Sequence, residues 1–380
     1  MKRNTCLVCG SALFPEPVLR LENLPASAQE MPGPSELDKD RGCDLELCQC
    51  SGCGLLQLNC EPVEYYRDVI RSCGFNDTVR RQRLGQYSDF ISRFSLEGRK
   101  IIEVGCGRGE FLELFNNFNV EAAGLEHSAA LVAEARKKGL SVYQGFAADE
   151  ATIIEGAPYD AFVSFNYLEH LPDPNGHLRC IYGNLKDGGC GLISVPSLEY
   201  IAEEGRWYEL VRDHLVYHTE QSLRSLLERN GFAVLECRRE NEDSILATVQ
   251  KRGRWDGAGL KGAFEALKTE LRSFIEESTK GGGRVAVWGA SHQSFTLLAT
   301  TGVADKIEFI VDSAPFKQNR FSPVSHIKIV PPERLFERPV ETVIIIAPAY
   351  TQEIYGIIRE NLGSKVRVAA ISRNEITILS

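Results

Sequence analysis

The sequence has no apolar run of the length that a membrane span requires. No uninterrupted stretch approaches the roughly 18–20 residues that cross a bilayer, and no apolar segment of a secretory signal follows the N-terminal residues. Basic residues are in the minority, with 43 Lys and Arg against 52 Asp and Glu and a net charge of −9. A phosphate backbone is therefore not the expected partner. We predict a cytoplasmic protein that binds neither membranes nor nucleic acids.

Internal repeats and low-complexity segments are also lacking. The 380 residues suffice for two or three domains with full cores, which excludes a mini-protein held together by disulfides. Hydrophobic residues make up 43% and charged residues 25% of the chain, a mixture typical of globular proteins and not of disordered ones. The sequence leaves the oligomeric state open, with a monomer as one option.

Cysteine is scarce after residue 73, because eight of the twelve cysteines lie within the first 73 residues. In a reducing compartment such a cluster indicates a metal site. Two C-x2-C pairs, each followed by glycine, are Cys6 with Cys9 and Cys50 with Cys53. A two-residue spacer lets both thiolates of a pair reach one ion, and two pairs complete a tetrahedral zinc site. We predict that these four cysteines hold a structural zinc ion; buried reduced cysteines are the alternative.

The remaining N-terminal cysteines are not expected to bind the metal. Cys48 forms a C-x-C pair with Cys50 and is set aside on spacing. Cys43, Cys60 and Cys73 are expected to pack as small hydrophobic side chains.

Short strands and helices alternate from residue 100 onward. Before it, prolines interrupt any periodic pattern in residues 1–75, which we interpret as an irregular module ordered by its metal. The expected strands are 100–105, 120–126, 141–145, 159–166 and 189–196, separated by helical segments at 110–117, 128–138 and 175–185. This alternation predicts a parallel sheet with helices on both faces.

The end of this domain follows a different pattern. Thr219 can cap a helix that ends near Gly231, and strands are expected at 232–239 and 245–250. Their short connection favours an antiparallel pair. We therefore predict a doubly wound, seven-stranded Rossmann-like α/β domain over residues 76–252.

The last part of the chain begins with one apolar stripe at helical spacing, from Leu260 to Ile275. It predicts a linker helix within residues 253–283 that stops at three consecutive glycines. Strands are then expected at 284–288, 307–311, 342–347 and 366–371, separated by helical segments. They predict a second, smaller Rossmann-like α/β domain over residues 284–380.

The first strand of the central domain runs into a glycine-rich turn. Residues 103–109 read E-V-G-C-G-R-G, and a helix is expected after them. A strand, a glycine turn and a helix in this order let the backbone approach a ligand at the carboxyl edge of the sheet. A second acid, Glu126, ends the next strand, where it can accept hydrogen bonds from ribose hydroxyls. The pattern predicts a cofactor cleft, with a dinucleotide as the alternative ligand.

This arrangement resembles motif I of the class I S-adenosylmethionine-dependent methyltransferases, over about residues 100–250. The resemblance implies that the glycines hold the methionine part of S-adenosylmethionine, that Glu126 binds its ribose, and that residues 147–149 lie near its adenine. The cofactor-binding residues that it implies are Glu103, Gly105, Gly107, Gly109, Glu126, Ala148 and Asn166. The segment N-Y-L-E-H-L-P-D at 166–173 also matches the family, after the fourth strand.

The whole chain resembles the nucleotide-sugar C-methyltransferases of deoxysugar pathways. These combine a zinc-binding head, a methyltransferase domain and a Rossmann-like C-terminal domain. The two cysteine pairs, the segment L-L-Q-L at 55–58 and the segment W-G-A-S at 288–291 carry the resemblance. It implies that the last domain binds a nucleotide sugar through Ser291, Asp312, Lys317 and Tyr350. A degenerate dinucleotide domain without a ligand is the alternative.

The same resemblance implies the chemistry. In that family a histidine removes a proton next to the 4-keto group of the sugar, and the resulting enolate attacks the methyl group. The matching residues here are Asp213, His214 and Tyr217. A neutral imidazole suits proton abstraction, and an adjoining carboxylate can orient it. We predict that His214 is the base and that it lies in the cofactor cleft, in a pocket shared with the last domain.

Three residues depart from the family pattern and leave the acceptor atom open. Asp213 replaces a glutamate, His218 a phenylalanine and Val211 a tyrosine. O- or N-methylation of a sugar nucleotide is therefore a second hypothesis. A non-methylating isomerase or binding protein is a third. For His214, the structural alternative is a helix-entry histidine satisfied by backbone, and for residues 169–170 it is capping and packing.

Overall fold

The computed structural model describes residues 3–68 and 75–379, which form two compact units that divide between Arg254 and Trp255. Cys73, one of the cysteines expected to pack as a small hydrophobic side chain, lies outside the described residues. No helix within these two ranges is both long enough and apolar enough to pass through a membrane.

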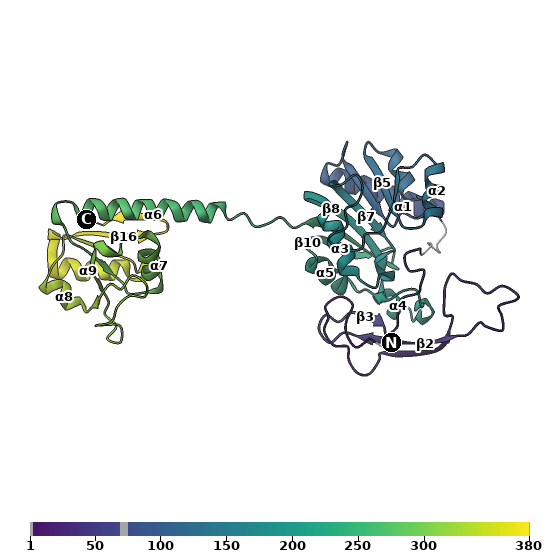
Figure 1. Ribbon diagram of the computed structural model, residues 1–380, viewed down its shortest axis with the longest axis horizontal. Coiled ribbons are helices and arrows are strands. Elements are labelled where there is room, and N and C mark those ends of the chain that lie inside the picture. Colours follow the sequence, from purple (N-terminus) through teal and green to yellow (C-terminus); the bar gives the residue numbers. More distant parts are fainter. Residues whose placement is uncertain (1–2, 69–74, 380) are drawn as a thin grey trace. The chain divides into compact units, whose positions relative to one another are not determined.

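A seven-stranded sheet forms the centre of the first unit, in the order β10-β11-β8-β7-β4-β5-β6 (Figure 1). Its strands are β4 (Lys100–Val104), β5 (Glu121–Glu126), β6 (Val142–Gln144), β7 (Tyr159–Phe165), β8 (Leu185–Pro196), β10 (Phe232–Glu240) and β11 (Ser244–Lys251). Strand β11 runs antiparallel to both β8 and β10, and the other neighbours are parallel. The predicted doubly wound sheet with an antiparallel end is confirmed.

Helices cover both faces of this sheet because neighbouring residues of a buried strand point to opposite faces. Ile101 packs in a cluster with residues of α1 (Asp77–Phe94) and α2 (Ala129–Lys137). Ile102 packs in another cluster with residues of α3 (Pro174–Gly183) and α5 (Glu220–Arg229). Each face of the sheet therefore has its own core.

Two of the predicted helices differ in how well the sequence predicted their structure. Thr219 caps α5 as expected, in a capping box with Ser222. The helix expected at 110–117 is a 3₁₀ helix, η1 (Leu112–Asn117). Its buried residues Leu112 and Phe115 are three positions apart, a spacing that puts side chains of a 3₁₀ helix on one face.

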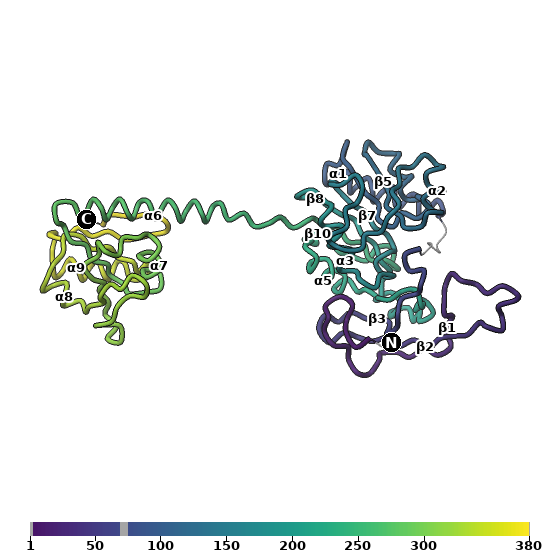
Figure 2. The backbone as a smooth tube through the Cα atoms, viewed as in Figure 1, coloured from purple at the N-terminus to yellow at the C-terminus, as the bar shows by residue number. Residues whose placement is uncertain are grey.

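The N-terminal head, residues 3–68, contains strands that the sequence analysis did not predict. They are β1 (Leu19–Leu24), β2 (Cys43–Gln49) and β3 (Leu56–Leu58), the purple strands of Figure 2. A fourth strand, β9 (Val216–Tyr217), joins β3 from a distant part of the chain, so the sheet order is β1-β2-β3-β9. The expectation of a wholly irregular head was wrong because its strands are short and its prolines lie between them.

The hydrophobic core of the head is shared with the central domain. Leu45, Leu47 and Leu58 of the head pack with Ile201 and Tyr217. Cys43 and Cys60 pack against the same cluster, as expected. The head and the central sheet therefore fold as one unit.

The second unit contains a six-stranded sheet in the order β14-β13-β12-β15-β16-β17. Its strands are β12 (Val285–Trp288), β13 (Ile307–Val311), β14 (Ile329–Val330), β15 (Thr342–Ile345), β16 (Arg367–Ser372) and β17 (Glu375–Ile378), and its helices include α7 (His292–Thr301), α8 (Pro332–Glu337) and α9 (Thr351–Leu362). The four predicted strands are present and parallel, and the sequence analysis missed β14 and the antiparallel β17.

Helix α6 (Ala258–Ser278), expected as a linker, packs on the second unit over its C-terminal half. Leu271 and Ile275 are fully buried in one cluster with Val285 and Leu298 of the sheet and α7. Leu260, at the other end of the same apolar stripe, is 66% exposed. The predicted helix is confirmed, and only part of its stripe has a partner within the unit.

The Leu271→Ala substitution should lower the free energy of unfolding of the second unit by about 2–5 kcal/mol, because it opens a cavity in a closed core. The matched substitution Leu260→Ala should change it by less than about 0.5 kcal/mol. Urea unfolding of the full chain, with hydrogen exchange followed in β12 to β16, measures both values. Equal effects of the two substitutions would contradict the packing of α6.

Candidate active site and metal centre

A cavity of about 420 Å³ lies at the carboxyl edge of the central sheet. Its lining comes from the ends of β4, β5, β7 and β8, from residues 201–214, and from Ala28 and Gln29 of the head. Six residues singled out from sequence line this one cavity: Gly105, Gly107, Glu126, Asn166, Asp213 and His214. The cofactor motif and the predicted base therefore meet, as expected.

The glycine turn after β4 requires glycine for two different reasons. Gly105, Gly107 and Gly109 all have positive φ angles, of 77°, 57° and 78°. A Cβ at Gly105 would lie 2.9 Å from the Tyr167 ring, and one at Gly109 would lie 2.4 Å from Leu140. Gly107 instead faces open space in the cavity lining. A side chain there would enter the space that a ligand needs.

Glu126 holds this turn and still offers acceptors to a ligand. Its Oε2 accepts the N–H of Gly107 at 2.9 Å, and its Oε1 accepts the N–H of Ser128 at 2.9 Å. Burial raises the pKa of this carboxyl group. Each carboxylate oxygen has two lone pairs, so one on each oxygen can accept a ribose hydroxyl. The turn and Glu126 together fit the methionine and ribose parts of S-adenosylmethionine.

Three of the residues expected to bind the cofactor lie outside the cavity lining. Glu103 is buried within β4, and Gly109 packs against Leu140. Ala148 is exposed after β6. A place for Ala148 near the adenine stays a prediction.

His214 is held in the cavity as a neutral imidazole. Burial, together with the neighbouring His170, lowers its pKa to about 3, and the two ring centroids lie 4.7 Å apart. None of the described residues forms a hydrogen bond with its ring nitrogens. The imidazole is therefore free to accept a proton, and the alternative of a histidine satisfied by backbone does not fit.

Asp213 does not orient His214 as the sequence analysis expected. Its Oδ2 accepts the hydroxyl of Tyr65 at 2.7 Å, and its Oδ1 accepts the N–H of Ala28 at 3.0 Å. Both partners belong to the head, and no pattern in the sequence indicates that the head contacts residue 213. Asp213 attaches the head to the cavity wall.

Tyr217, also expected beside the base, is buried and its hydroxyl is used by the backbone. This hydroxyl accepts the N–H of Val211 at 2.9 Å and donates to the carbonyl of Val211 at 3.2 Å. Burial raises its pKa. Tyr217 lies outside the cavity lining and stabilises the loop that carries His214.

A 3₁₀ helix after β7, η2 (Leu168–His170), holds the same loop from the other side. The N–H of Leu215 donates to the carbonyl of Glu169 at 2.7 Å, and Nδ1 of His170 donates to the carbonyl of Asp213 at 2.9 Å. Glu169 and His170 are both buried and both line the cavity. Capping and packing account for His170 in part, but they give the Glu169 carboxyl group no role.

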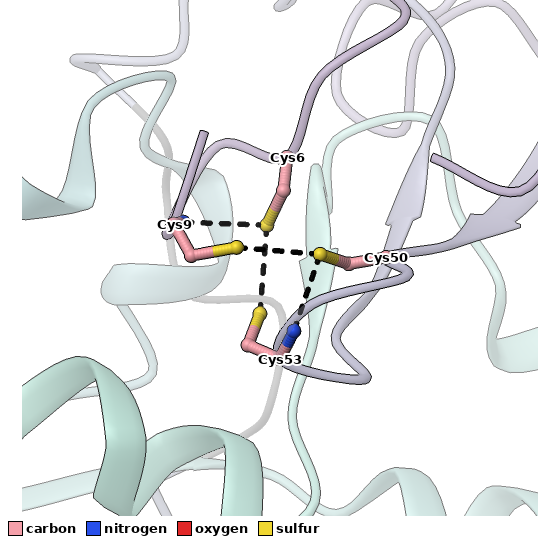
Figure 3. Close-up of side chains that lie close together, drawn as sticks. All are labelled: Cys6, Cys9, Cys50 and Cys53. Carbon is pink, nitrogen blue, oxygen red and sulfur yellow. Dashed lines mark hydrogen bonds between the residues drawn. The ribbon is translucent and has the colours of Figure 1, made fainter. Parts of the chain in front are cut away.

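The four predicted zinc ligands are brought together in the head (Figure 3). The Sγ atoms of Cys9 and Cys50 lie 3.3 Å apart, and those of Cys6 and Cys53 lie 3.6 Å apart. A zinc ion bonded to four thiolates at about 2.3 Å separates the sulfurs by about 3.8 Å. A small outward movement of the side chains admits the ion, so the donor set fits tetrahedral zinc.

The two cysteine turns have the same backbone geometry. Gly10 and Gly54 have φ angles of 75° and 74°, and their N–H groups donate to the carbonyls of Cys6 and Cys50. Cys48 is buried elsewhere on β2 and is not part of the cluster. The repeated turn is the geometry that a C-x2-C-G spacing was expected to produce.

In the second unit, the predicted sugar-nucleotide residues follow the carboxyl ends of parallel strands. Ser291 caps α7 directly after β12, and Asp312 follows β13. The carboxylate of Asp312 accepts the N–H of Ala290 at 2.8 Å and pairs with Lys317 at 3.0 Å. Tyr350 follows β15 and is 62% exposed. Their use by a ligand stays a prediction.

Two family models match the chain. A model described as a methyltransferase domain matches residues 79–237, and one described as a C-methyltransferase C-terminal domain matches residues 246–368. These ranges cover the cavity with His214 and most of the second unit, respectively.

Two curated relatives are similar to the chain over different shares of its length. The C-methyltransferase NovU of Streptomyces niveus is 22% identical over 346 residues, covering 82% of this chain and 81% of that protein. A ubiquinone biosynthesis O-methyltransferase of Bordetella avium is 30% identical over 100 residues, which is 25% of this chain and 42% of that enzyme.

Solved structures that are similar to this chain include two S-adenosylmethionine-dependent methyltransferases. An S-adenosylmethionine-dependent methyltransferase from Clostridium acetobutylicum has a TM-score of 0.37 at 11% identity, covering 46% of this chain and 92% of its own. One from Archaeoglobus fulgidus has a TM-score of 0.37 at 19% identity, covering 45% and 94%.

The glycine turn, Glu126 and the matching domain make the chain an S-adenosylmethionine-dependent methyltransferase of the class I fold. Its C-terminal part is similar to the C-terminal domain of C-methyltransferases.

Substitution of Cys50 by serine should abolish zinc binding, because it removes one of four thiolates and a three-thiolate site binds zinc far more weakly. The wild-type protein should contain one zinc ion per chain, and the control Cys48→Ser, two positions before Cys50, should retain that ion. Elemental analysis of the purified full chains measures all three. Zinc near zero in the wild type would exclude the site, and loss in Cys48→Ser would reassign the ligands.

Substitution of Glu126 by alanine should weaken S-adenosylmethionine binding about 10- to 100-fold, because it removes hydrogen-bond acceptors of about 1.4–2.7 kcal/mol and loosens the Gly107 turn. Isothermal titration calorimetry measures the affinity. Glu121→Ala, at the exposed start of the same strand, is the control and should leave it unchanged. An unchanged affinity in Glu126→Ala would remove this residue from the site.

Proposed function

We propose that the chain transfers a methyl group from S-adenosylmethionine to a carbon of a nucleotide-linked 4-keto deoxysugar, with His214 as the general base. The observation that carries the proposal is the shared cavity. One space is lined by Gly107 and Glu126, which suit the methyl donor, and by His214, whose ring nitrogens are available. A base and a methyl donor in one cavity are what methylation at carbon requires.

Proton removal is the step that these residues perform. The C–H bond next to the carbonyl breaks, its proton passes to a ring nitrogen of His214, and the electron pair enters an enolate of the sugar. S-Adenosylmethionine supplies an electrophilic methyl group when bound. The enolate carbon forms the new C–C bond as the methyl–sulfur bond breaks, and the sulfur keeps that electron pair.

Burial prepares His214 for this role. Because its pKa lies at about 3, the imidazole is neutral throughout the physiological range and needs no prior deprotonation. The cavity also excludes part of the bulk water, which strengthens electrostatic contacts to the developing enolate.

The second unit is proposed to bind the nucleotide part of the substrate. Ser291, Asp312 and Tyr350 follow strands β12, β13 and β15 at the same edge of a parallel sheet, where open α/β sheets bind ligands. Lys317 beside Asp312 supplies a positive charge suited to a phosphate group. The C-methyltransferase match of this region supports the assignment.

The four-cysteine cluster is proposed to hold a structural zinc ion that orders the head. An ordered head keeps Ala28 and Gln29 in the cavity wall, so the metal acts on the site without entering it. Free thiolates persist in a reducing compartment, which supports a cytoplasmic location.

Methylation of a sugar-nucleotide oxygen or nitrogen is the second candidate. The similarity to ubiquinone biosynthesis O-methyltransferases favours it, since those enzymes are named for methyl transfer to oxygen. In that case the cavity positions a hydroxyl or an amine, and His214 takes the proton of that group.

The deciding experiment incubates the protein with a panel of nucleotide-linked 4-keto sugars in deuterated water, with and without labelled S-adenosylmethionine. Deuterium at the carbon next to the carbonyl without methyl donor, and a labelled methyl on that carbon with it, support C-methylation. Label on oxygen or nitrogen alone would establish the second candidate. Exchange without methyl transfer would indicate an isomerase.

Substitution of His214 by asparagine should reduce deuterium exchange at least about 100-fold, because the proton acceptor is lost. Affinity for S-adenosylmethionine should stay within about tenfold, or 1.4 kcal/mol. His326→Asn, at an exposed position in the second unit, is the control and should exchange at the wild-type rate. Wild-type exchange in His214→Asn would exclude this histidine as the base.

A further inference from the structure

A second carboxyl group lies buried beside the proposed base. Glu169 is 2% exposed, lines the same cavity as His214, and comes from η2, directly after the central strand β7. Its Oε2 has no hydrogen-bond partner among the described residues. A buried carboxyl oxygen without a partner is costly for stability, so a role in binding or catalysis is the expected compensation.

Glu169 is placed to interact with His214. One ligand atom each of Glu169, His170 and His214 lies within 4.8 Å of the other two. A separation of up to 4.8 Å can be spanned by one water molecule or closed by rotation of a side chain. Nδ1 of His170 donates to the backbone, so its Nε2 keeps a lone pair and is a second acceptor in the cluster.

A buried imidazolium at His214 needs a counter-charge that it can contact directly, and the Asp213 carboxylate is bonded elsewhere. Both oxygens of Asp213 accept hydrogen bonds from the head, at 2.7 Å from Tyr65 and 3.0 Å from Ala28. Without a counter-charge, protonation of a desolvated imidazole raises the barrier of the step that forms it. Among the described residues, Glu169 is the carboxyl group in reach of His214 with an oxygen that lacks a partner.

We propose that Glu169 is the proton-accepting partner of His214, so that the two side chains act as one base. The sugar C–H bond breaks, its proton passes to a ring nitrogen of His214, and the imidazolium then gives a proton to Oε2 of Glu169. The enolate keeps the electron pair of the broken bond, and Glu169 returns the proton to water after methyl transfer. This inference rests on the proposed C–H chemistry at His214.

The electrostatics of the cluster support the pairing. Burial raises the pKa of Glu169 to about 8 and lowers that of His214 to about 3. When Glu169 is ionised, Glu169 and His214 together therefore bind a proton more strongly than the His214 imidazole alone. The pKa of the pair then lies near neutral pH, where a general base is most effective.

The other titratable and charged groups that face this cluster come from four parts of the unit. They are His170 of η2, Asp213 and Tyr217 of the following loop and strand, Arg108, Glu110 and Glu126 of the cofactor loops, and Tyr208 and Glu209 of η3 (Trp207–Glu209).

The test compares the pH dependence of deuterium exchange in the wild type, Glu169→Gln and Glu169→Asp, all as the full zinc-containing chain. The wild-type rate should rise as the pH increases through about 8, because Glu169 becomes ionised. In Glu169→Gln the rate should no longer rise with pH, kcat should fall about 100-fold, and KM should stay within about threefold of the wild-type value. Glu169→Asp should recover at least a tenth of the wild-type rate. Glu236→Gln, on the exposed part of β10, is the matched control and should match the wild type.

A measurement without turnover separates this inference from the proposed function. In infrared spectra of the wild type, a carboxylic acid band should disappear as the pH passes about 8, and Glu169→Gln should lack that band. If the band titrates but the wild type exchanges no sugar proton, the keto-sugar chemistry fails and the titrating pair is supported. If exchange occurs and Glu169→Gln keeps the wild-type rate and pH profile, the pair is overturned.

Elemental analysis after dialysis against excess Zn²⁺ gives a further outcome. Zinc at one ion per chain in both the wild type and Glu169→Gln supports the pair. A second ion in the wild type that Glu169→Gln loses would assign the three side chains to a cation and overturn the proposal.

Discussion

The pairing of β3 with β9 is the contact on which the position of His214 depends. Leu56 pairs with Tyr217, and the N–H of Leu58 donates to the carbonyl of Leu215 at 2.9 Å. On the other side of the loop, η2 binds the backbone of residues 213 and 215. The main chain on both sides of the imidazole is therefore fixed, and no hydrogen bond to its ring is needed to hold it. This leaves both ring nitrogens available for proton transfer.

The parts of the fold that follow from local pattern could be predicted from the sequence. The alternation of strands and helices after residue 100 defines a doubly wound sheet because each buried strand needs helices on both faces. The spacing of the cysteine pairs defines the metal cluster because a two-residue turn has one geometry. The glycine turn and Glu126 follow from the same kind of local constraint, and so does their meeting at one sheet edge.

The parts of the fold that depend on distant partners could not be predicted from the sequence. The strands of the head are short, and β3 is completed by β9, which no periodicity connects with it. Asp213 stands next to His214 in sequence, yet its partners Tyr65 and Ala28 lie in the head. Adjacency therefore suggested a role for Asp213 beside His214, whereas the residue that we propose for this role, Glu169, is 45 positions away in the chain.

The shared sheet of the head has a consequence for biosynthesis. Strand β3 leaves the ribosome long before β9 does, and its free edge exposes unpaired backbone groups until residue 217 has been made. The cysteine cluster, complete at residue 53, lies next to this edge in sequence. Metal loading of the nascent chain would then order the two cysteine turns while β3 waits for its partner, so the supply of zinc to the cell becomes part of the folding route.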